Sequence, residues 1–137
     1  MSLEAYVWLD WQGDICAQVQ RAKETIGDRP VGRLWLDVEQ EAGGLDHRAI
    51  LDRLRQAASE CAALPAGIYT SVSKWRELTG NSREFADLPL WSAYYTSDDS
   101  LDKWGGPYGG WTECHIRQHA GDIDLCGIHV DLNICAG

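Results

Sequence analysis

The stretch Arg33-Leu34-Trp35-Leu36-Asp37-Val38-Glu39 alternates between aliphatic residues and residues of other kinds. Residues two apart on a β-strand point to the same face and lie roughly 6 to 7 Å apart along the chain. The aliphatic side chains therefore share one face, which suits packing under helices. The opposite face carries Trp35, Asp37 and Glu39. The pattern predicts a strand that ends in two acids on one side.

The two acids are the candidate chemical centre of the chain. In α/β barrels the catalytic groups come from the C-terminal tips of parallel strands, which is where Asp37 and Glu39 are expected. Two carboxylates this close cannot both ionise freely, so one should have a raised pKa. A proton retained near neutral pH is what a general acid for glycoside cleavage needs. The alternative is structural: a helix-capping acid beside a solvated strand end.

The segments on either side alternate between strand-like and helix-like periodicity. Strands are predicted over residues 5–10, 33–39, 67–70 and 88–95, and two more near 115–119 and 128–134. The three expected helices have their caps at Asp14, Asp46 and Ser73. Their apolar stripes are Ile15, Val19, Ala22 and Ile26, then Ile50, Leu54, Ala57 and Cys61, then Trp75 and Leu78. Residues 96–110 have no helical stripe and predict a long loop.

This order, β-α-β-α-β-α-β-β-β, predicts the α/β class with about six strands and three helices. In the last strand, His129, Asp131 and Asn133 share a polar face opposite an aliphatic one. That polar face is interpreted either as the wall of a wet site or as the solvent side of an outer strand, and the sequence leaves both open.

The length and composition favour a single folded domain over residues 1–137. A net charge of −9 argues against a nucleic-acid partner. No apolar run is long enough to span a membrane, and the first residues show no secretory signal. The composition offers no long-range attraction to an anionic polymer, so binding to one would depend on local contacts. Seven Trp residues could provide them.

Five cysteines form no CxxC framework, and their odd number leaves at least one thiol free or paired between chains. The favoured interpretation is reduced, buried cysteines that act as small hydrophobes. A Cys114–Cys126 disulfide across a hairpin is the main alternative. A zinc site formed by Cys114, His115, Cys126 and His129 has ligand spacing that fits no usual site. We therefore expect no metal and no cofactor.

Four segments together resemble the Chalaropsis-type lysozymes, glycoside hydrolase family 25. They are Leu34-Trp35-Leu36-Asp37-Val38-Glu39, Gly67-Ile68-Tyr69-Thr70-Ser71, Leu88-Pro89-Leu90-Trp91-Ser92-Ala93-Tyr94-Tyr95 and Val130-Asp131-Leu132-Asn133. Their order and spacing fit the family from about Ala5 to the end of the chain. The resemblance implies a barrel of five βα units followed by three strands. It also implies an N-acetylmuramidase that acts on peptidoglycan, outside the cell.

The resemblance also implies roles for individual residues. Glu39 resembles the general acid/base, and Asp37 would hold the substrate's 2-acetamido group while that group attacks the anomeric carbon. Such substrate assistance gives retention of configuration. Asp131 matches the active-site acid of the family's last strand. The residues Tyr69, Trp91 and Tyr95 are candidates for sugar contact, although each also suits barrel packing.

The chain departs from the family pattern in three ways. It opens at what resembles the third strand, so a partial barrel without the first two βα units, and without the aspartate of the first strand, is expected. Asp10 is a poor substitute for that aspartate. Arg117 and His119 stand where the family commonly has aromatic residues on either side of Gln118, which puts sugar binding in doubt.

The missing strands should leave two open sheet edges, which favour self-association or a partner segment. The alternative to an active muramidase is therefore a truncated glycan-binding domain, or a barrel fragment that is stable only in an assembly.

Overall fold

The computed structural model describes residues 3–136, with the side chains of residues 122, 125, 129 and 130 outside the described set. The elements follow the predicted order: β1 (Leu3–Trp8), α1 (Ile15–Ile26), β2 (Val31–Asp37), α2 (His47–Cys61), β3 (Ala66–Thr70), α3 (Val72–Thr79), β4 (Leu90–Ala93), β5 (Ile116–Leu125) and β6 (Ile128–Cys135). The predicted α/β class and element order are confirmed.

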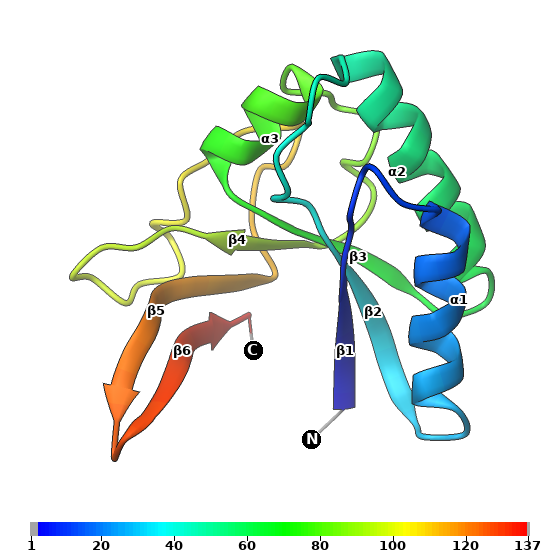
Figure 1. The fold of residues 1–137 in the computed structure, drawn as a ribbon. Helices are drawn as coiled ribbons and strands as arrows, with labels where there is room; N and C mark the ends of the chain where they lie inside the picture. Colours follow the sequence, from blue (N-terminus) through cyan, green and yellow to red (C-terminus); the bar gives the residue numbers. More distant parts are fainter. Residues whose placement is uncertain (1–2, 137) are drawn as a thin grey trace.

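The six strands form one sheet in the order β1-β2-β3-β4-β5-β6. The first five strands are parallel, and β6 returns antiparallel to β5. Figure 1 shows the sheet curling from β1, in blue, round to β6, in red, as a half-barrel. Within residues 3–136 the strands β1 and β6 are the two ends of the sheet and are not paired with each other. The partial barrel predicted from the sequence is confirmed.

The helices α1 and α2 begin where the sequence predicts. The Asp14 side chain accepts a hydrogen bond from the Ala17 amide, and α1 stops at Gly27, whose φ is 58°. Asp46 caps α2 in the same way, through the Ala49 amide at 2.8 Å. The buried residues of α2 are the four of the predicted stripe: Ile50, Leu54, Ala57 and Cys61.

The N-cap predicted for α3 is wrong by two residues. Ser71, and not Ser73, has an extended backbone, and its Oγ accepts from the Lys74 amide at 3.3 Å. The physical reason is that β3 runs to Thr70, which leaves one residue to turn the chain into the helix. Ser73 consequently lies in the first turn of α3, exposed at the surface.

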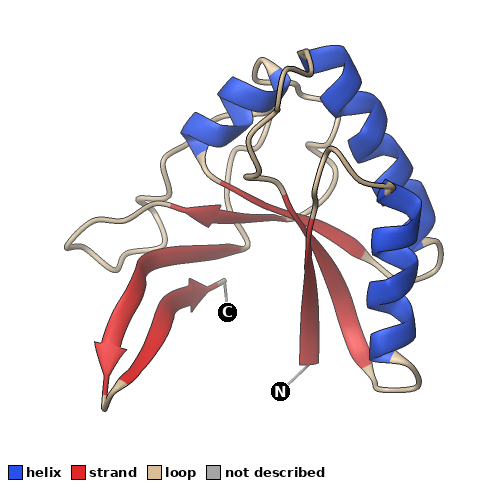
Figure 2. Cartoon of the chain, viewed as in Figure 1, coloured by secondary structure: helices blue, strands red, loops and turns tan. Residues whose placement is uncertain are grey.

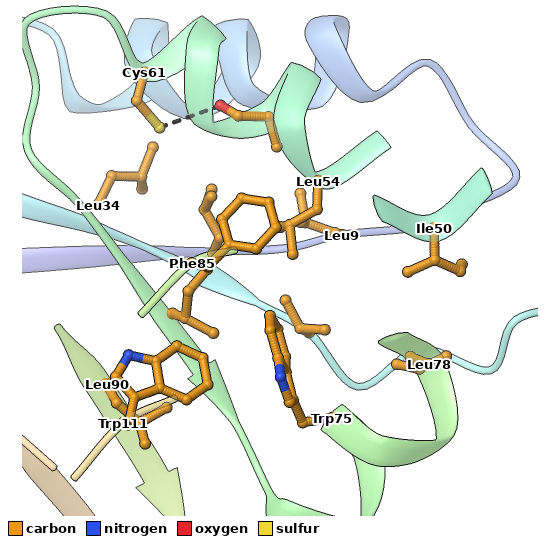
Figure 3. Packing of buried hydrophobic residues seen from close by; sticks show 14 of the residues in the cluster. Leu9, Leu34, Ile50, Leu54, Cys61, Trp75, Leu78, Phe85, Leu90 and Trp111 are labelled. Atoms are coloured by element: carbon orange, nitrogen blue, oxygen red, sulfur yellow. Dashed lines mark hydrogen bonds between the residues drawn. The ribbon is translucent and has the colours of Figure 1, made fainter. Parts of the chain in front are cut away.

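The core lies between the outer face of the sheet and the helices, which cover that face together (Figure 2). The aliphatic face of β2 is fully buried there, as Leu34, Leu36 and Val38. Figure 3 shows Leu9 and Leu34 of this core below α2, together with the rings of Trp75, Phe85 and Trp111. Burial of each such side chain contributes about 1.5–3 kcal/mol, so the outer face fixes which side of β2 is left for the site. None of the helices within residues 3–136 is long and apolar enough to cross a membrane.

The loop at residues 96–110 is held in place by Arg117, a fully buried cation of β5. Its guanidinium donates to the Tyr94 carbonyl at 2.9 Å and 3.0 Å and to the Thr96 hydroxyl at 2.7 Å. It also donates to the Ser100 carbonyl. Because Arg117 faces this loop, the long loop is ordered without a helix of its own.

The prediction of reduced, buried cysteines agrees with the structure only in part. All five carry free thiols. Cys61 and Cys114 are buried, as the sequence interpretation held, but Cys126 and Cys135 are exposed. The reason is their position on the β5–β6 hairpin: Cys126 and Gly127 form its turn, both with positive φ, and Cys135 ends the edge strand. Among the residues that the structure describes, no three His, Cys, Asp or Glu side chains could together hold a metal.

Candidate active site

The strand register brings four site residues into one row across the sheet. Asp37, the last residue of β2, pairs with Trp8 of β1 on one side and with Tyr69 of β3 on the other. Tyr69 in turn pairs with Trp91 of β4. Residues aligned in neighbouring parallel strands project to the same side of a sheet, so this row forms the inner wall of the half-barrel.

A cavity of about 340 Å³ opens on this inner wall, and we call it the inner chamber. All six residues that the sequence predicted for the site line it. Its lining consists of Tyr6, Trp8, Asp37, Glu39, Tyr69, Trp91, Tyr95, Gln118 and Asp131. The last-strand acid therefore shares a cavity with the β2 pair, as the hypothesis of a wet inner face required. His129, on the same strand, lies outside the described side chains.

Asp37 is the acid whose titration is shifted. Only 5% of it is exposed. Burial, then a hydrogen bond to Glu39 and the negative charge of Glu39, raise the pKa of Asp37 to about 9. Its Oδ1 is buried and has no hydrogen-bond partner. The prediction that one acid of the pair has a raised pKa agrees with the structure, in which Asp37 is the acid whose pKa is raised.

Two tyrosine hydroxyls converge on Gln118, which is almost fully buried in the wall. Tyr95 donates to the Gln118 Oε1 at 2.7 Å, and Tyr69 donates to the same oxygen. Burial raises the pKa of Tyr69, and the neighbouring Tyr95, Glu39, Asp37 and Asp131 raise it further. Both phenols donate their hydroxyl protons to Gln118, so any hydrogen bond from a ligand to either oxygen has to be donated by the ligand.

Trp91 both packs in the barrel and lines the chamber. Its indole lies edge-on to Tyr69, with ring centroids 5.1 Å apart, and to Trp35, at 5.6 Å. Its Nε1 donates to the Asn133 Oδ1 of β6 at 2.9 Å. This bond shows that the polar face of β6 is directed toward the inner wall, which is the side where Asp131 lines the chamber.

A second cavity, of about 460 Å³, adjoins the first, and we call it the outer chamber. Its lining consists of Glu39, Tyr69, Thr70, Ser71, Val72, Ser73, Lys74, Ala93, Tyr94 and Tyr95. The two chambers share Glu39, Tyr69 and Tyr95. The cation of the outer chamber, Lys74, is paired with Glu41 at 2.6 Å and with Glu77 at 3.4 Å.

Sequence reasoning missed Tyr6 and Trp8 as site residues. The signal was available, because they stand two apart on a predicted strand and so share a face. Both are exposed, at 65% and 47%. The Trp8 Nε1 donates to the Gln40 Oε1 at 3.0 Å, and the Trp11 Nε1 donates to the Gln40 carbonyl at 2.8 Å. Two indoles therefore hold the residue that follows Glu39.

Three residues discussed from the sequence do not line the inner chamber: Asp10, Arg117 and His119. Asp10 is exposed beyond the end of β1, and its Oδ1 accepts from the Gln12 amide at 3.1 Å. Arg117 and His119 flank Gln118 on β5, so their side chains alternate away from the wall that Gln118 faces. The inner chamber does not include these two positions, and the effect of the two replacements on sugar binding stays a prediction.

Residues 3–119 match the family described as Lysozyme-like protein 1. The chain belongs to this lysozyme-like family. Among relatives of this lysozyme-like chain is Probable GH family 25 lysozyme 5 of Dictyostelium discoideum, 33% identical over 105 residues, which are 73% of this chain and 48% of the relative. The chain thus spans about half the length of that curated relative.

Solved structures show the same fold over more of the lysozyme-like chain. The muramidase from Trichobolus zukalii superposes with a TM-score of 0.72 at 25% identity, over 91% of this chain and 62% of the muramidase. The bacterial lysozyme from Streptomyces coelicolor gives a TM-score of 0.77 at 19% identity, over 98% and 67%. The glycoside hydrolase family 25 resemblance read from the four segments is therefore confirmed.

Proposed function

We propose that this lysozyme-like domain hydrolyses the bond between N-acetylmuramic acid and N-acetylglucosamine in peptidoglycan, and that it does so outside the cell. The observation that carries the proposal is the composition of the inner chamber. Three acids, Asp37, Glu39 and Asp131, line it together with aromatic side chains. Hydrolysis of a glycosidic bond needs acids. Binding of the sugar is favoured by aromatic faces, which pack on the apolar faces of pyranose rings.

The first step of the proposed mechanism is recognition of the 2-acetamido group. The buried Oδ1 of Asp37 lacks a partner, and the acetamido N–H is a donor that suits it. A hydrogen bond donated to a carboxylate favours its charged form. Binding of the acetamido group therefore lowers the proton affinity of Asp37. The proton that Asp37 holds passes to Glu39 through the hydrogen bond that joins them.

The second step is cleavage assisted by the substrate itself. The acetamido oxygen attacks the anomeric carbon, and the bond from that carbon to the leaving oxygen breaks. Glu39 donates its proton to the leaving oxygen, and Asp37, now a carboxylate, stabilises the positive charge on the acetamido nitrogen. Water then attacks the anomeric carbon of the cyclic intermediate and loses a proton to Glu39, while the bond from that carbon to the acetamido oxygen breaks and the neutral acetamido group is restored. Two inversions give net retention.

The remaining residues of the inner chamber bind the sugar and stabilise the transition state. Asp131 supplies negative charge from the last strand near the oxocarbenium-like transition state. Tyr69, Trp91 and Tyr95 contact the sugar rings. No cofactor enters this scheme.

A second candidate function is glycan binding without turnover. It is favoured by the open edges of the sheet at β1 and β6 within residues 3–136, and by the 62% of the Trichobolus zukalii muramidase that the chain covers. In that case the chamber holds a sugar without turnover, because water that enters between the unpaired strands β1 and β6 of the described sheet is not excluded from the glycosidic bond.

A cell-wall clearing assay separates the two functions. The purified chain should lower the turbidity of a peptidoglycan suspension, and Glu39→Gln should abolish the clearing while wall pull-down persists. Glu41→Gln is the matched control, because Glu41 is an exposed acid two residues away that pairs with Lys74. Equal lack of clearing by the parent chain and Glu39→Gln, with wall binding retained by both, would establish the binding function instead.

A further inference from the structure

Another cavity lies at the opposite end of the sheet from the two chambers, and we call it the base cavity. Its volume is about 710 Å³, larger than that of either chamber. Its lining includes Leu90, the first residue of β4, and His115, which immediately precedes β5. These strand beginnings lie away from the strand tip that carries Asp37 and Glu39. No residue that the structure describes lines both the base cavity and a chamber.

Arg33 of β2 lines the base cavity and carries a buried hydrogen-bond donor, its Nε, that has no acceptor. Among the described residues, the other buried side-chain nitrogen or oxygen without a partner is the Asp37 Oδ1. The two residues stand four apart on the same face of β2, roughly 13 Å from each other along the strand. Buried donors almost always have a partner in folded proteins. The free donor of Arg33 therefore indicates a ligand that supplies an acceptor.

The ring of Trp35 fixes the two basic side chains of the base cavity. The guanidinium carbon of Arg33 lies 5.5 Å from the centroid of this ring, and the ring of His115 lies 6.2 Å from it. Trp35 itself is fully buried, and its Nε1 donates to the Glu4 Oε2 at 2.8 Å. The guanidinium is thus held in place before a ligand arrives. Its Nε–H and a neighbouring Nη–H are spaced to match the two oxygens of a carboxylate.

Three acids, Asp87, Asp102 and Glu113, line the same cavity. All three are exposed, which places them at its rim. Within the described part of the chain, no ion pair neutralises any of them. A ligand with a carboxylate alone would therefore be attracted by Arg33 and repelled by the rim. A ligand that also carries an ammonium group is attracted by both.

We propose that the base cavity binds a short peptide, with its free C-terminal carboxylate on Arg33 and an ammonium group at the acidic rim. The remaining lining includes the apolar side chains of Leu88, Pro89 and Leu101, which suit a peptide with small apolar side chains. The volume lies within the range of about 300–1,000 Å³ that is usual for ligand pockets. The inference uses no residue of the two chambers, so it is independent of the proposed function.

Titration of the 15N-labelled full chain at neutral pH with the tripeptide Lys-Ala-Ala tests the site. The amide signals of Thr112, Glu113 and His115 should shift to saturation, and those of Glu39 and Tyr69 in the chambers should not. The same peptide with an amidated C-terminus lacks the carboxylate and should bind at least about tenfold more weakly. The absence of saturable shifts at the base cavity, or equal affinity for the free and the amidated peptide, would overturn the proposal.

Substitution of the arginine tests its role directly. Arg33→Gln should weaken binding of Lys-Ala-Ala about tenfold. Arg33→Lys keeps the positive charge but loses the paired donors, so it should also weaken binding. Arg29→Gln is the matched control, because Arg29 is an exposed arginine outside the cavity that donates to the Thr25 carbonyl at 2.6 Å. Equal affinity of the Arg33→Gln and Arg29→Gln chains contradicts the inference.

A variant of the rim tests the ammonium contact without touching the core. Asp87→Asn, Asp102→Asn and Glu113→Gln are combined in one chain, and all three positions are exposed. This chain should bind Lys-Ala-Ala about fivefold more weakly than the parent chain. The affinity for the peptide with both amines acetylated should not fall, because that peptide has no ammonium group. No loss for Lys-Ala-Ala, or an equal loss for both peptides, refutes the assignment of the rim.

Discussion

Replacing Asp37 by Asn should make the protein more stable at neutral pH and change how its stability depends on pH. Asp37 is 5% exposed, and its pKa is raised to about 9 by burial and by Glu39. In the unfolded chain the carboxyl is solvated and titrates near 3.8. The folded state therefore binds the proton more tightly than the unfolded state, so the contribution of Asp37 is fully present below about pH 4 and is lost as the pH rises toward 9.

The size of the effect follows from linkage. One proton released on unfolding gives a slope of about −1.4 kcal/mol in the free energy of unfolding per pH unit. From pH 5 to pH 7 the stability difference between Asp37→Asn and the parent chain should therefore widen by roughly 3 kcal/mol. The titratable groups that face Asp37 are Glu39, two residues after the end of β2, Tyr69 on β3 and Asp131 on β6. The difference between the two proteins removes the contribution of distant groups and reports on Asp37 together with Glu39, to which it is coupled.

Urea denaturation followed by Trp fluorescence, at pH 5, 6 and 7 and constant ionic strength, measures this difference. The stability gap between Asp37→Asn and the parent chain should widen with each step in pH. Asp28→Asn, at an exposed position after α1, controls for the loss of one negative charge from a chain of net charge −9. Parallel pH profiles for the parent chain and Asp37→Asn would refute the reasoning that Asp37 is buried in protonated form.

Three further predictions concern the wall of the half-barrel. Gly67→Ala should lower the free energy of unfolding by about 1–3 kcal/mol in urea titrations, because the added Cβ would lie 2.5 Å from the ring of fully buried Trp35; an unchanged midpoint would show that the ring has room to move. Arg117→Lys should speed amide hydrogen exchange across residues 96–105, because Lys cannot reproduce the forked bonds to Tyr94, Thr96 and Ser100. Exchange rates in this loop equal to those of the parent chain would contradict this. The purified chain should associate through the open edges of β1 and β6, so light scattering should give a mass that rises with concentration, and a monomer at every concentration would exclude it.

Much of the site could be predicted because its signals are local. The alternation in β2 separates Leu34, Leu36 and Val38 from Trp35, Asp37 and Glu39 without knowledge of any neighbour, since side chains alternate on every strand. The same reasoning placed Asp131 on the polar face of β6. It also places Tyr6 and Trp8 on a common face of β1, but the spacing does not say that this face belongs to the site.

Other features depend on contacts between distant segments. The sequence predicts that one acid of the pair keeps its proton, but it does not say which. The burial of Asp37 comes from strands 29 and 32 residues away in sequence, through its pairing with Trp8 and Tyr69. The convergence of Tyr69 and Tyr95 on Gln118 spans 49 and 23 residues. From the sequence, Arg117 is interpreted as the replacement of an aromatic sugar contact. Its hydrogen bonds to Tyr94, Thr96 and Ser100 are visible only in the structure.

From the sequence alone came the order of strands and helices, the helix caps at Asp14 and Asp46 and six of the residues that line the inner chamber. These follow from periodicities and caps that span only a few residues. Tertiary structure decided the register of the strands, the division of the site at Glu39 and the burial that raises the pKa of Asp37. The physical reason is that register, curvature and burial arise between segments far apart in the chain, where no short sequence pattern specifies the distance or the dielectric surroundings.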